Sequence, residues 1–294
     1  MNIVDKNLPR KSELIKKKLH FLKGTKIPLM SEIEISDSGT CNRKCPFCPR
    51  SDPEYPNIKE FISAKLHKKI FKELSEINYS GLVIYSGFVE PMLNKKIYQN
   101  IFEARNFLPE AAIELITNGD ILNLERLKKL FDAGLDTILI SVYDGKEQEE
   151  MFYELCVSAK LKKNQYVIRN RYLSETQDFG MNFSNRSGML EKAVYSVKSV
   201  QEPLNKECFY PAYKFFIDYN GDVLICSHDW GKKNIVGNLN DQTILDVWLN
   251  KKFEFARKNL LLGKRTLEPC RRCDVNGILI GKASSDEWKN IYKL

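Results

Sequence analysis

Three closely spaced cysteines stand in the stretch GTCNRKCPFCPR, residues 39–50. Cys41, Cys45 and Cys48 have the spacing C-x3-C-x2-C, and the two prolines of the stretch favour a tight loop from which three thiolates can converge on one inorganic centre. A zinc site normally needs a fourth Cys or His nearby, and the sequence provides none at the expected distance. The triplet fits a four-iron cube that keeps one iron open, which is a catalytic rather than an electron-storing arrangement.

The chain around this loop alternates between short β-type runs and amphipathic helical stretches. This repetition predicts parallel strands joined by right-handed crossovers. We expect an α/β fold with a partial barrel because the glycine fingerprint of a Rossmann sheet is missing, although the pattern alone does not separate the two architectures. The predicted strands are Ile33–Ser36, Leu82–Ser86, Ile113–Thr117, Thr137–Val142 and Tyr166–Arg171, and the predicted helices are Ala64–Glu76, Lys95–Asn106 and Asn123–Ala133.

The cysteine triplet, with the aromatic Phe47 before its last member, resembles the signature of the radical S-adenosylmethionine (SAM) superfamily. The resemblance implies a core of about five to six strands and a 4Fe-4S cluster whose open iron chelates SAM. It also implies the first chemical step, in which one electron from the cluster cleaves SAM into methionine and a 5'-deoxyadenosyl radical that abstracts hydrogen from a substrate. Phe47 would belong to the residues that bind this cofactor.

The end of the second predicted strand carries SGFVEP, residues 86–91, which resembles the family's Gly-Gly-Glu-Pro stretch. The resemblance implies that Glu90 receives the ammonium group of SAM, and a carboxylate is a suitable partner for an ammonium ion. Phe88 and Val89 replace the usual glycines, so the expected backbone contact to SAM is less secure than the contact of Glu90.

Polar residues also follow the third, fourth and fifth predicted strands. Thr-Asn-Gly at 117–119 is similar to a family motif in which Asn118 would hydrogen-bond the ribose or the methionine carboxylate. Ser141 resembles the serine of the family's Ser-x-Asp-Gly. Arg169 or Arg171 would pair with the carboxylate of SAM. Turn-forming and capping roles compete with this interpretation at these positions.

A different kind of sequence follows residues 174–203, a segment rich in Asn, Ser and Gly that we expect to form a loop. Tyr213–Tyr219 and Asp222–Cys226 flank an Asn-Gly pair and predict a β-hairpin. Thr243–Asn259 has the periodicity of one amphipathic helix, and a loop with a short tail follows it.

Four further cysteines belong to this region, namely Cys208, Cys226, Cys270 and Cys273. A hairpin and a distant C-x2-C loop that bring four thiolates together would close a metal site completely. The spacing alone permits either a 4Fe-4S cluster or structural zinc.

A second resemblance favours the cluster. Residues 208–276 resemble the C-terminal SPASM/Twitch extension of radical SAM enzymes, through IVGNL at 235–239, DVW at 246–248, Arg257 and CRRCD at 270–274. No cysteine follows Cys273, so the resemblance is to the shorter Twitch form, found in the family's aminocyclitol dehydrogenases, and implies one auxiliary 4Fe-4S cluster. We therefore expect an arm or helix over residues 1–29, a radical SAM partial barrel over 30–200, and a small α+β SPASM/Twitch domain with a β-hairpin and a helix over 201–294.

The superfamily implies the initiating step but leaves the overall reaction open, because fold and cofactor do not specify the substrate. The favoured hypothesis is oxidation of a carbinol in a sugar, aminocyclitol or nucleotide-linked sugar, with the auxiliary cluster as electron acceptor. Arg186 and Asp229 are the candidate polar contacts to the substrate. Two alternatives remain: an epimerase with Cys156 as hydrogen donor, and an enzyme that modifies a peptide. A lone cysteine in an amphipathic helix is more often a small buried hydrophobic residue.

Composition limits the partners of the 294-residue chain. The net charge of +8 is scattered in short lysine runs with no basic stripe, so we expect no nucleic-acid groove. The longest apolar runs are too short to span a membrane, and no signal-peptide core precedes residue 10, so we predict a cytoplasmic protein. We expect a small-molecule substrate, possibly anionic, and an electron donor such as flavodoxin or ferredoxin.

Overall fold

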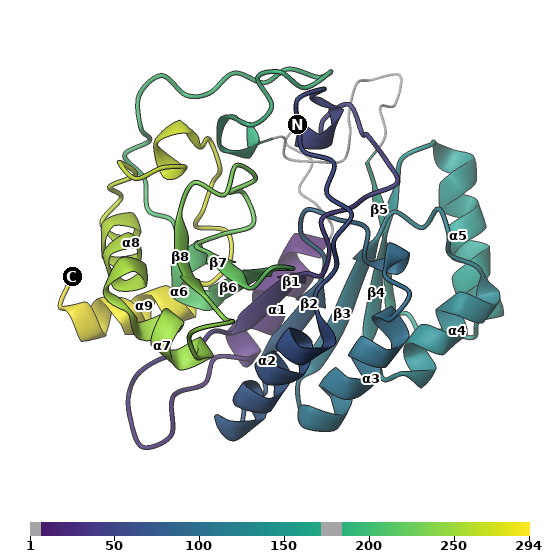
Figure 1. Cartoon of the computed structure of the whole chain (residues 1–294), viewed down its shortest axis with the longest axis horizontal. Coiled ribbons are helices and arrows are strands. Elements are labelled where there is room, and N and C mark those ends of the chain that lie inside the picture. Colours follow the sequence, from purple (N-terminus) through teal and green to yellow (C-terminus); the bar gives the residue numbers. More distant parts are fainter. Residues whose placement is uncertain (1–6, 172–183) are drawn as a thin grey trace.

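The computed structural model describes residues 7–171 and 184–294. In these residues one sheet of eight strands runs through the molecule in the order β5-β4-β3-β2-β1-β6-β7-β8 (Figure 1). Strands β1 to β6 run parallel to one another, whereas β7 is antiparallel to both β6 and β8. The strands are β1 Glu32–Ser36, β2 Leu82–Tyr85, β3 Ala112–Thr117, β4 Thr137–Val142, β5 Tyr166–Asn170, β6 Lys214–Asp218, β7 Asp222–Leu224 and β8 Ile235–Asn238.

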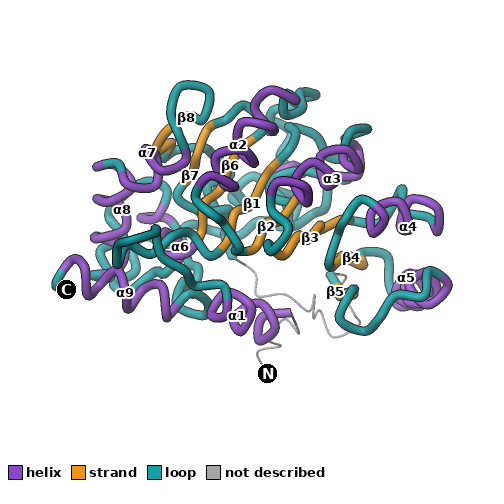
Figure 2. Tube along the Cα trace, turned by 90° about the horizontal axis from the view of Figure 1, so that it is seen from below, coloured by secondary structure: helices purple, strands orange, loops and turns teal. Residues whose placement is uncertain are grey.

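Helices connect successive parallel strands and cover one side of the sheet (Figures 1 and 2). Neighbours in the series α2 to α5 pack against each other, and α1 packs against α9 at the other side of the molecule. The α-helices in the described residues are α1 Asn7–Lys17, α2 Ala64–Glu76, α3 Ile97–Phe107, α4 Leu124–Asp132, α5 Lys146–Ser158, α6 Tyr210–Tyr213, α7 Ile244–Leu249, α8 Lys251–Leu261 and α9 Lys282–Tyr292, and the short 3-10 helices are Pro49–Ser51, Pro91–Leu93, Arg186–Gly188 and Cys270–Arg272.

The predicted α/β fold with a partial barrel is confirmed. All residues of β1, β2 and β4 are buried, as expected for parallel strands covered on both faces. Helix α2 has the predicted bounds because the side chain of Ser63 caps its first turn, accepting a hydrogen bond from the Leu66 backbone N–H.

The predicted hairpin forms, but it extends the barrel sheet. Its first strand, β6, pairs in parallel with β1, and β7 returns beside β6. Lys214 at the start of β6 forms ion pairs with two buried carboxylates of β1, at 2.9 Å to Glu32 and also to Glu34. The sheet therefore crosses residue 200, so we retain the division into a barrel over 30–200 and a cluster domain over 201–294 only as a proposal.

Two predictions for the C-terminal region are wrong. The stretch predicted as one helix is two, α7 and α8, because Asn250 adopts an extended conformation and its side chain caps α8 by accepting a hydrogen bond from the Phe253 backbone N–H. The predicted short tail contains the 11-residue helix α9, whose Trp288 is buried. The buried Arg257 of α8 joins this helix to α6 and α9, since its guanidinium donates to the backbone carbonyl of Pro211 and to the Tyr292 hydroxyl.

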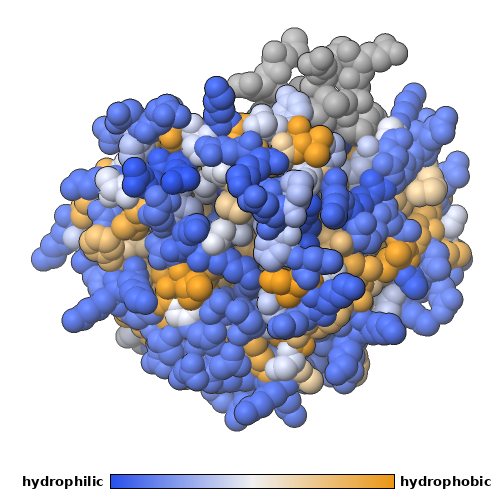
Figure 3. Space-filling model, turned by 45° about the horizontal axis from the view of Figure 1, so that its top comes forward, coloured by the Kyte–Doolittle hydropathy of each residue, from blue (hydrophilic) through white to orange (hydrophobic). Residues whose placement is uncertain are grey.

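Hydrophobic residues occur in small groups among hydrophilic ones on the face seen in Figure 3. Within the described ranges, no helix is both long and apolar enough to cross a membrane. The N-terminal prediction is confirmed from Asn7 onward as α1, and the loop predicted over 174–203 is irregular from residue 184 apart from one 3-10 turn; residues 1–6 and 174–183 lie outside the described residues.

Candidate active site

A cavity of about 670 Å³ lies where the parallel strands end. Ligands of such folds bind at the carboxyl ends of the strands, so this is the expected position. The loop after β1 and the segments that follow β2, β3, β4 and β5 all contribute to its wall. Many predicted site residues line it together: Cys41, Cys45, Cys48, Phe47, Glu90, Asn118, Ser141, Arg169, Arg171 and Arg186.

The cysteine loop is held in a tight turn. The Cys48 backbone N–H donates to the Cys45 carbonyl at 2.9 Å, and the Ser51 hydroxyl donates to the Cys48 carbonyl at 2.8 Å. Burial raises the pKa of all three thiols, and for Cys45 the two neighbouring cysteines help to raise it to about 12. Three thiolates at this site therefore require a cationic partner, which iron would supply.

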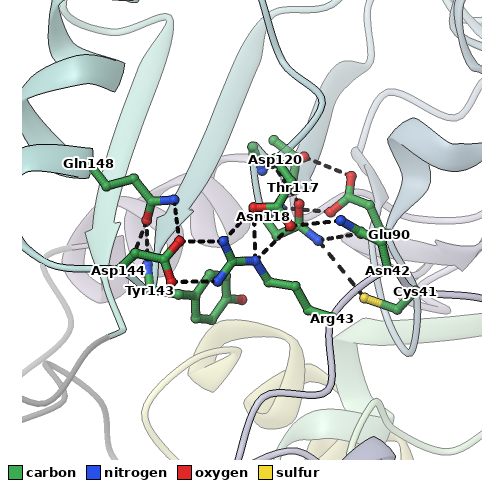
Figure 4. A network of polar contacts seen from close by, with 11 residues as sticks. Cys41, Asn42, Arg43, Glu90, Thr117, Asn118, Asp120, Tyr143, Asp144 and Gln148 are labelled. Atoms are coloured by element: carbon green, nitrogen blue, oxygen red, sulfur yellow. Dashed lines mark hydrogen bonds and ion pairs between the residues drawn. The ribbon is translucent and has the colours of Figure 1, made fainter.

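Arg43, between the first two cysteines, fixes the loop to two strand ends (Figure 4). Its guanidinium donates to the carboxylate of Asp120, which follows β3, and at 2.9 Å to that of Asp144, which follows β4. It also lies 5.0 Å from the ring centroid of Tyr143. This role of Arg43 could not be predicted from the sequence, because no pattern links an arginine to carboxylates so distant along the chain.

Arg50 secures the other end of the loop. Its Nε and Nη2 donate to the Phe88 carbonyl at 2.8 and 2.7 Å, and Nη2 also donates to the Gly39 carbonyl at 2.8 Å. The Phe88 ring packs against Phe216 and Trp230 at centroid distances of 4.8 and 4.6 Å. The phenylalanine that departs from the family's glycine thus joins the cluster loop to the C-terminal half of the chain.

Glu90 is buried at the junction of two strand ends (Figure 4). Its carboxylate accepts hydrogen bonds from the Thr117 hydroxyl at 2.7 Å, the Asn118 backbone N–H at 2.7 Å and the Met92 backbone N–H at 3.0 Å. A carboxylate has about four acceptor positions, so one is left for a ligand donor. Burial raises the pKa of Glu90 to about 7, because the surroundings disfavour its charge until a cation binds.

Asn118 contacts the cysteine loop through its side chain. Its Nδ2 donates to the side-chain oxygen of Asn42 at 2.8 Å and lies 3.9 Å from the Cys41 sulfur. On the neighbouring strands, Arg169 donates to the Ser141 hydroxyl at 2.9 Å. The predicted cofactor-binding side chains therefore form two linked groups on the cavity wall, one around the cysteines and one on β4 and β5.

The other four clustered cysteines line a second, smaller cavity. The Gly277 backbone closes on it, since a Cβ there would lie 2.3 Å from the Cys208 sulfur. Among the described residues, no three His, Cys, Asp or Glu side chains are placed to hold a single metal ion. A closed set of four thiols around a shared space suits a cluster better than mononuclear zinc.

The two cavities are adjacent. Tyr210, His228 and Val275 line both of them. His228 lies between the Ser184 hydroxyl and the Tyr210 hydroxyl, at 3.3 Å from each. Burial lowers the pKa of His228 well below its usual value, and the positive charges around it, Arg186 among them, lower it further.

The three candidate catalytic residues lie in different places. Arg186 lines the large cavity. Asp229 is fully buried outside both cavities, and its carboxylate accepts hydrogen bonds from the Lys233 and Asn234 backbone N–H groups, both at 2.8 Å. Cys156, on the buried side of α5, is 0% exposed and lines neither cavity.

Two family models match the chain. The radical SAM superfamily model matches residues 35–169, and an iron-sulfur cluster-binding domain, SPASM, matches residues 208–274. The chain has a radical SAM domain followed by a SPASM domain. The matched segments contain the cysteine triplet and the second cysteine group. The two domains therefore indicate SAM and 4Fe-4S clusters as the cofactors of this chain.

Individual relatives span nearly the whole described fold. A SAM-dependent 2-deoxy-scyllo-inosamine dehydrogenase of Niallia circulans is 28% identical over 248 residues, which is 84% of this chain and 93% of the relative. The solved structure of BtrN in complex with AdoMet and 2-DOIA has a TM-score of 0.72 and 25% identity, covering 86% of this chain and 96% of that one. The structure of anSMEcpe with bound AdoMet, 16% identical with a TM-score of 0.55, covers 89% and 96% and shares the fold.

The residues present fit these cofactors. The large cavity offers three thiols and a buried carboxylate with one free acceptor position, which suits an open-site cluster and the ammonium group of SAM. The small cavity offers four thiols, which suits a closed cluster.

Proposed function

We propose that this radical SAM enzyme is an oxidoreductase that converts a carbinol of a sugar, aminocyclitol or nucleotide-linked sugar to a carbonyl, with the auxiliary cluster as electron acceptor. When bound, SAM and the first cluster supply a radical that takes a hydrogen atom from the carbinol carbon, and the auxiliary cluster takes up one electron. The hydroxyl proton leaves to a base or to water, which completes the two-electron oxidation.

The observation that carries this proposal is the contact between the two cavities. Tyr210, His228 and Val275 line both, so the substrate space adjoins the cavity of the second group of cysteines, to which an electron would pass. The similarity to a 2-deoxy-scyllo-inosamine dehydrogenase supports the same chemistry. The buried position of Cys156, away from the cavity, gives no support to an epimerase.

We assign the binding groups from their positions on the cavity wall. Glu90 receives the SAM ammonium, Ser141 and Arg169 receive its carboxylate, and Asn118 hydrogen-bonds the ribose or orders the loop around Cys41. Phe47 stacks on Tyr143 at 6.1 Å between ring centroids and shields this part of the site. Arg171 lies at the end of β5 beside the substrate space.

The proposal also includes a reducing partner and compartment. The first cluster needs electrons one at a time, which a flavodoxin or ferredoxin supplies. No disulfide joins any of the eight cysteines, which is typical of a reducing compartment, and we place the enzyme in the cytoplasm.

Product analysis tests the reaction. Anaerobically reconstituted enzyme, given SAM, a reductant and a panel of cyclitols and sugars, is expected to form ketone and 5'-deoxyadenosine in equal amounts, with deuterium from the carbinol carbon in the 5'-deoxyadenosine. Cys156→Ala should give the same products at a similar rate. Recovery of an epimer in place of a ketone, and its loss in Cys156→Ala, would contradict the proposal.

A further inference from the structure

The carboxylates of the large cavity are committed to partners within the chain. Glu34 forms an ion pair with Lys214. Glu90 accepts three hydrogen bonds, and Asp274 accepts the Asn185 backbone N–H at 2.9 and 3.0 Å on its two oxygens. The carboxylates of the cavity wall are therefore bound to other residues of the chain. Only the single free acceptor position of Glu90 can contact a bound cation.

Arg186 differs from these groups. It lines the cavity and is half-buried, and its guanidinium has no hydrogen bond or ion pair with any residue in the described part of the chain. Burial disfavours the charged form of Arg186 most and lowers its pKa, Cys48 favours that form, and the positive charge of Arg171 disfavours it. A half-buried guanidinium that has no partner beside a cavity is stabilised by an anion that binds to it.

Arg186 lies in a turn with an unfavourable backbone conformation. Arg186 and Ser187 both adopt the left-handed conformation, with φ of 48° and 56°, which is unfavourable for residues other than glycine. The preceding Asn185 fixes this turn: its backbone N–H binds Asp274, and its Nδ2 donates to the Arg272 carbonyl at 2.7 Å. Both anchors belong to the loop that carries the last two cysteines, so the strained turn is held in place by the auxiliary site.

We propose that Arg186 binds an anionic group, a phosphate or a carboxylate, on a single-ring polyol substrate. This inference rests on the proposed function and narrows its substrate class. A cavity of about 670 Å³ is of ordinary size for one ligand, and here it must also hold SAM and a cluster, which favours a single ring over a nucleotide-linked sugar. An aminocyclitol, which carries an ammonium group at neutral pH, would be repelled by Arg186, so this substrate differs from the one in the name of the Niallia relative.

Calorimetric titration of the reconstituted, SAM-saturated enzyme tests the proposal. The probes are myo-inositol 1-phosphate, glucuronate, neutral myo-inositol and 2-deoxy-scyllo-inosamine. At least one anionic ligand should bind ten times or more tightly than myo-inositol, and the amine should bind most weakly. The phosphate and the carboxylate probe distinguish the two kinds of anion.

Variants assign the effect to Arg186. Arg186→Gln should weaken binding of the anion about 10- to 100-fold and leave the affinity for myo-inositol nearly unchanged, which a general loss of structure would not do. Arg186→Lys should recover part of the anion affinity because it restores the charge without the planar fork. Arg126→Gln, a half-buried arginine on α4 outside the cavity, is the matched control.

Three outcomes would overturn the inference: neither anion binds, the amine binds as tightly as the anions, or Arg186→Gln and Arg186→Lys both keep the wild-type ratio of anion to neutral affinity. The proposed function fails separately. If the wild-type enzyme does not cleave SAM, the oxidoreductase proposal is wrong, whereas the ranking of the four probes still tests the anion site.

Discussion

At the scale of residues, the site is built from charged groups whose partners are set by strand ends that lie far apart in the sequence. Glu90 joins the end of β2 to the end of β3, and Arg43 joins the cysteine loop to β3 and β4 (Figure 4). These contacts shape the cavity and leave few groups free to bind a ligand.

The raised pKa of Glu90 predicts a pH dependence of SAM binding. The carboxyl has a pKa of about 7 in the cofactor-free protein, and the SAM ammonium requires the carboxylate, so a proton must leave on binding below pH 7. SAM affinity should therefore fall as the pH decreases, approaching about tenfold per pH unit well below pH 7. Equilibrium dialysis of reconstituted enzyme from pH 5.5 to 8.5 measures this.

Glu90→Gln separates this effect from other titrations. At pH 8.5 it should bind SAM about 10- to 100-fold more weakly than the wild type, and its affinity should vary little with pH. Glu76→Gln, which changes an exposed carboxylate at the end of α2, serves as control. A wild-type pH profile in Glu90→Gln would show that another group titrates.

The sequence predicted the residues whose role follows from spacing. Seven cysteines in two groups were placed by their intervals, and the motif residues Glu90, Asn118 and Ser141 line the same cavity as expected. Arg43 and Arg50 could not be predicted, because their roles depend on which distant carboxylates and carbonyls the fold brings near. Asp229 looked like a polar contact, but its local sequence does not reveal that two backbone N–H groups already occupy its carboxylate.

At the scale of elements, the cysteine loop must be held in one conformation, since its three thiolates have to lie close together. Its turn is short, and most of its fixation comes from Arg43 and Arg50 at its two ends. Asp120 and Asp144 are part of the loops after β3 and β4, so the position of the cysteines depends on the geometry of the barrel.

Arg43→Ala is expected to loosen this loop. Its ion pairs are partly exposed and are worth about 1 kcal/mol after solvent screening, so the rate of SAM cleavage should fall about fivefold, with slower incorporation of iron into the first cluster. Lys44→Ala changes the adjacent, exposed residue and should have little effect. Equal rates in the two variants would contradict a fixing role for Arg43.

Helices and strands were predicted correctly where the local sequence determines them, and incorrectly where contacts with distant parts of the chain determine them. Helix α2 and strand β4 have the predicted bounds, because a cap and a run of buried residues mark them in the sequence. The pairing of β6 with β1 could not be read from the sequence, since a hairpin signal specifies the turn and leaves the neighbouring sheet open. The apolar periodicity of the sequence continues across Asn250, so it predicted one helix and did not reveal the break between α7 and α8.

At the scale of the whole molecule, the barrel and the C-terminal cysteine region share one sheet. Lys214 of β6 is buried between Glu32 and Glu34 of β1, so the two regions are joined by charges as well as by strand pairing. This continuity keeps the large cavity and the small one at a fixed separation, as electron transfer between them requires.

Lys214→Met should destabilise the enzyme strongly, by about 3–5 kcal/mol, because the buried Glu34 loses its ion-pair partner and the buried Glu32 keeps only Lys11. Urea unfolding under anaerobic conditions measures the change. Lys258→Met removes an exposed ion pair with Glu254 and should alter stability by less than about 0.5 kcal/mol. Similar changes in both variants would mean that the β1–β6 charges do not hold the two regions together.

The central claim is that two clusters divide the work between two cysteine groups, and the iron content together with SAM cleavage tests it most directly. Reconstituted wild type should hold about eight irons and form 5'-deoxyadenosine with a strong reductant, and Cys270→Ala/Cys273→Ala should hold about four and still cleave SAM. Cys45→Ala/Cys48→Ala should also hold about four irons but form no 5'-deoxyadenosine. Zinc in place of iron, or no SAM cleavage by the wild type, would contradict the account.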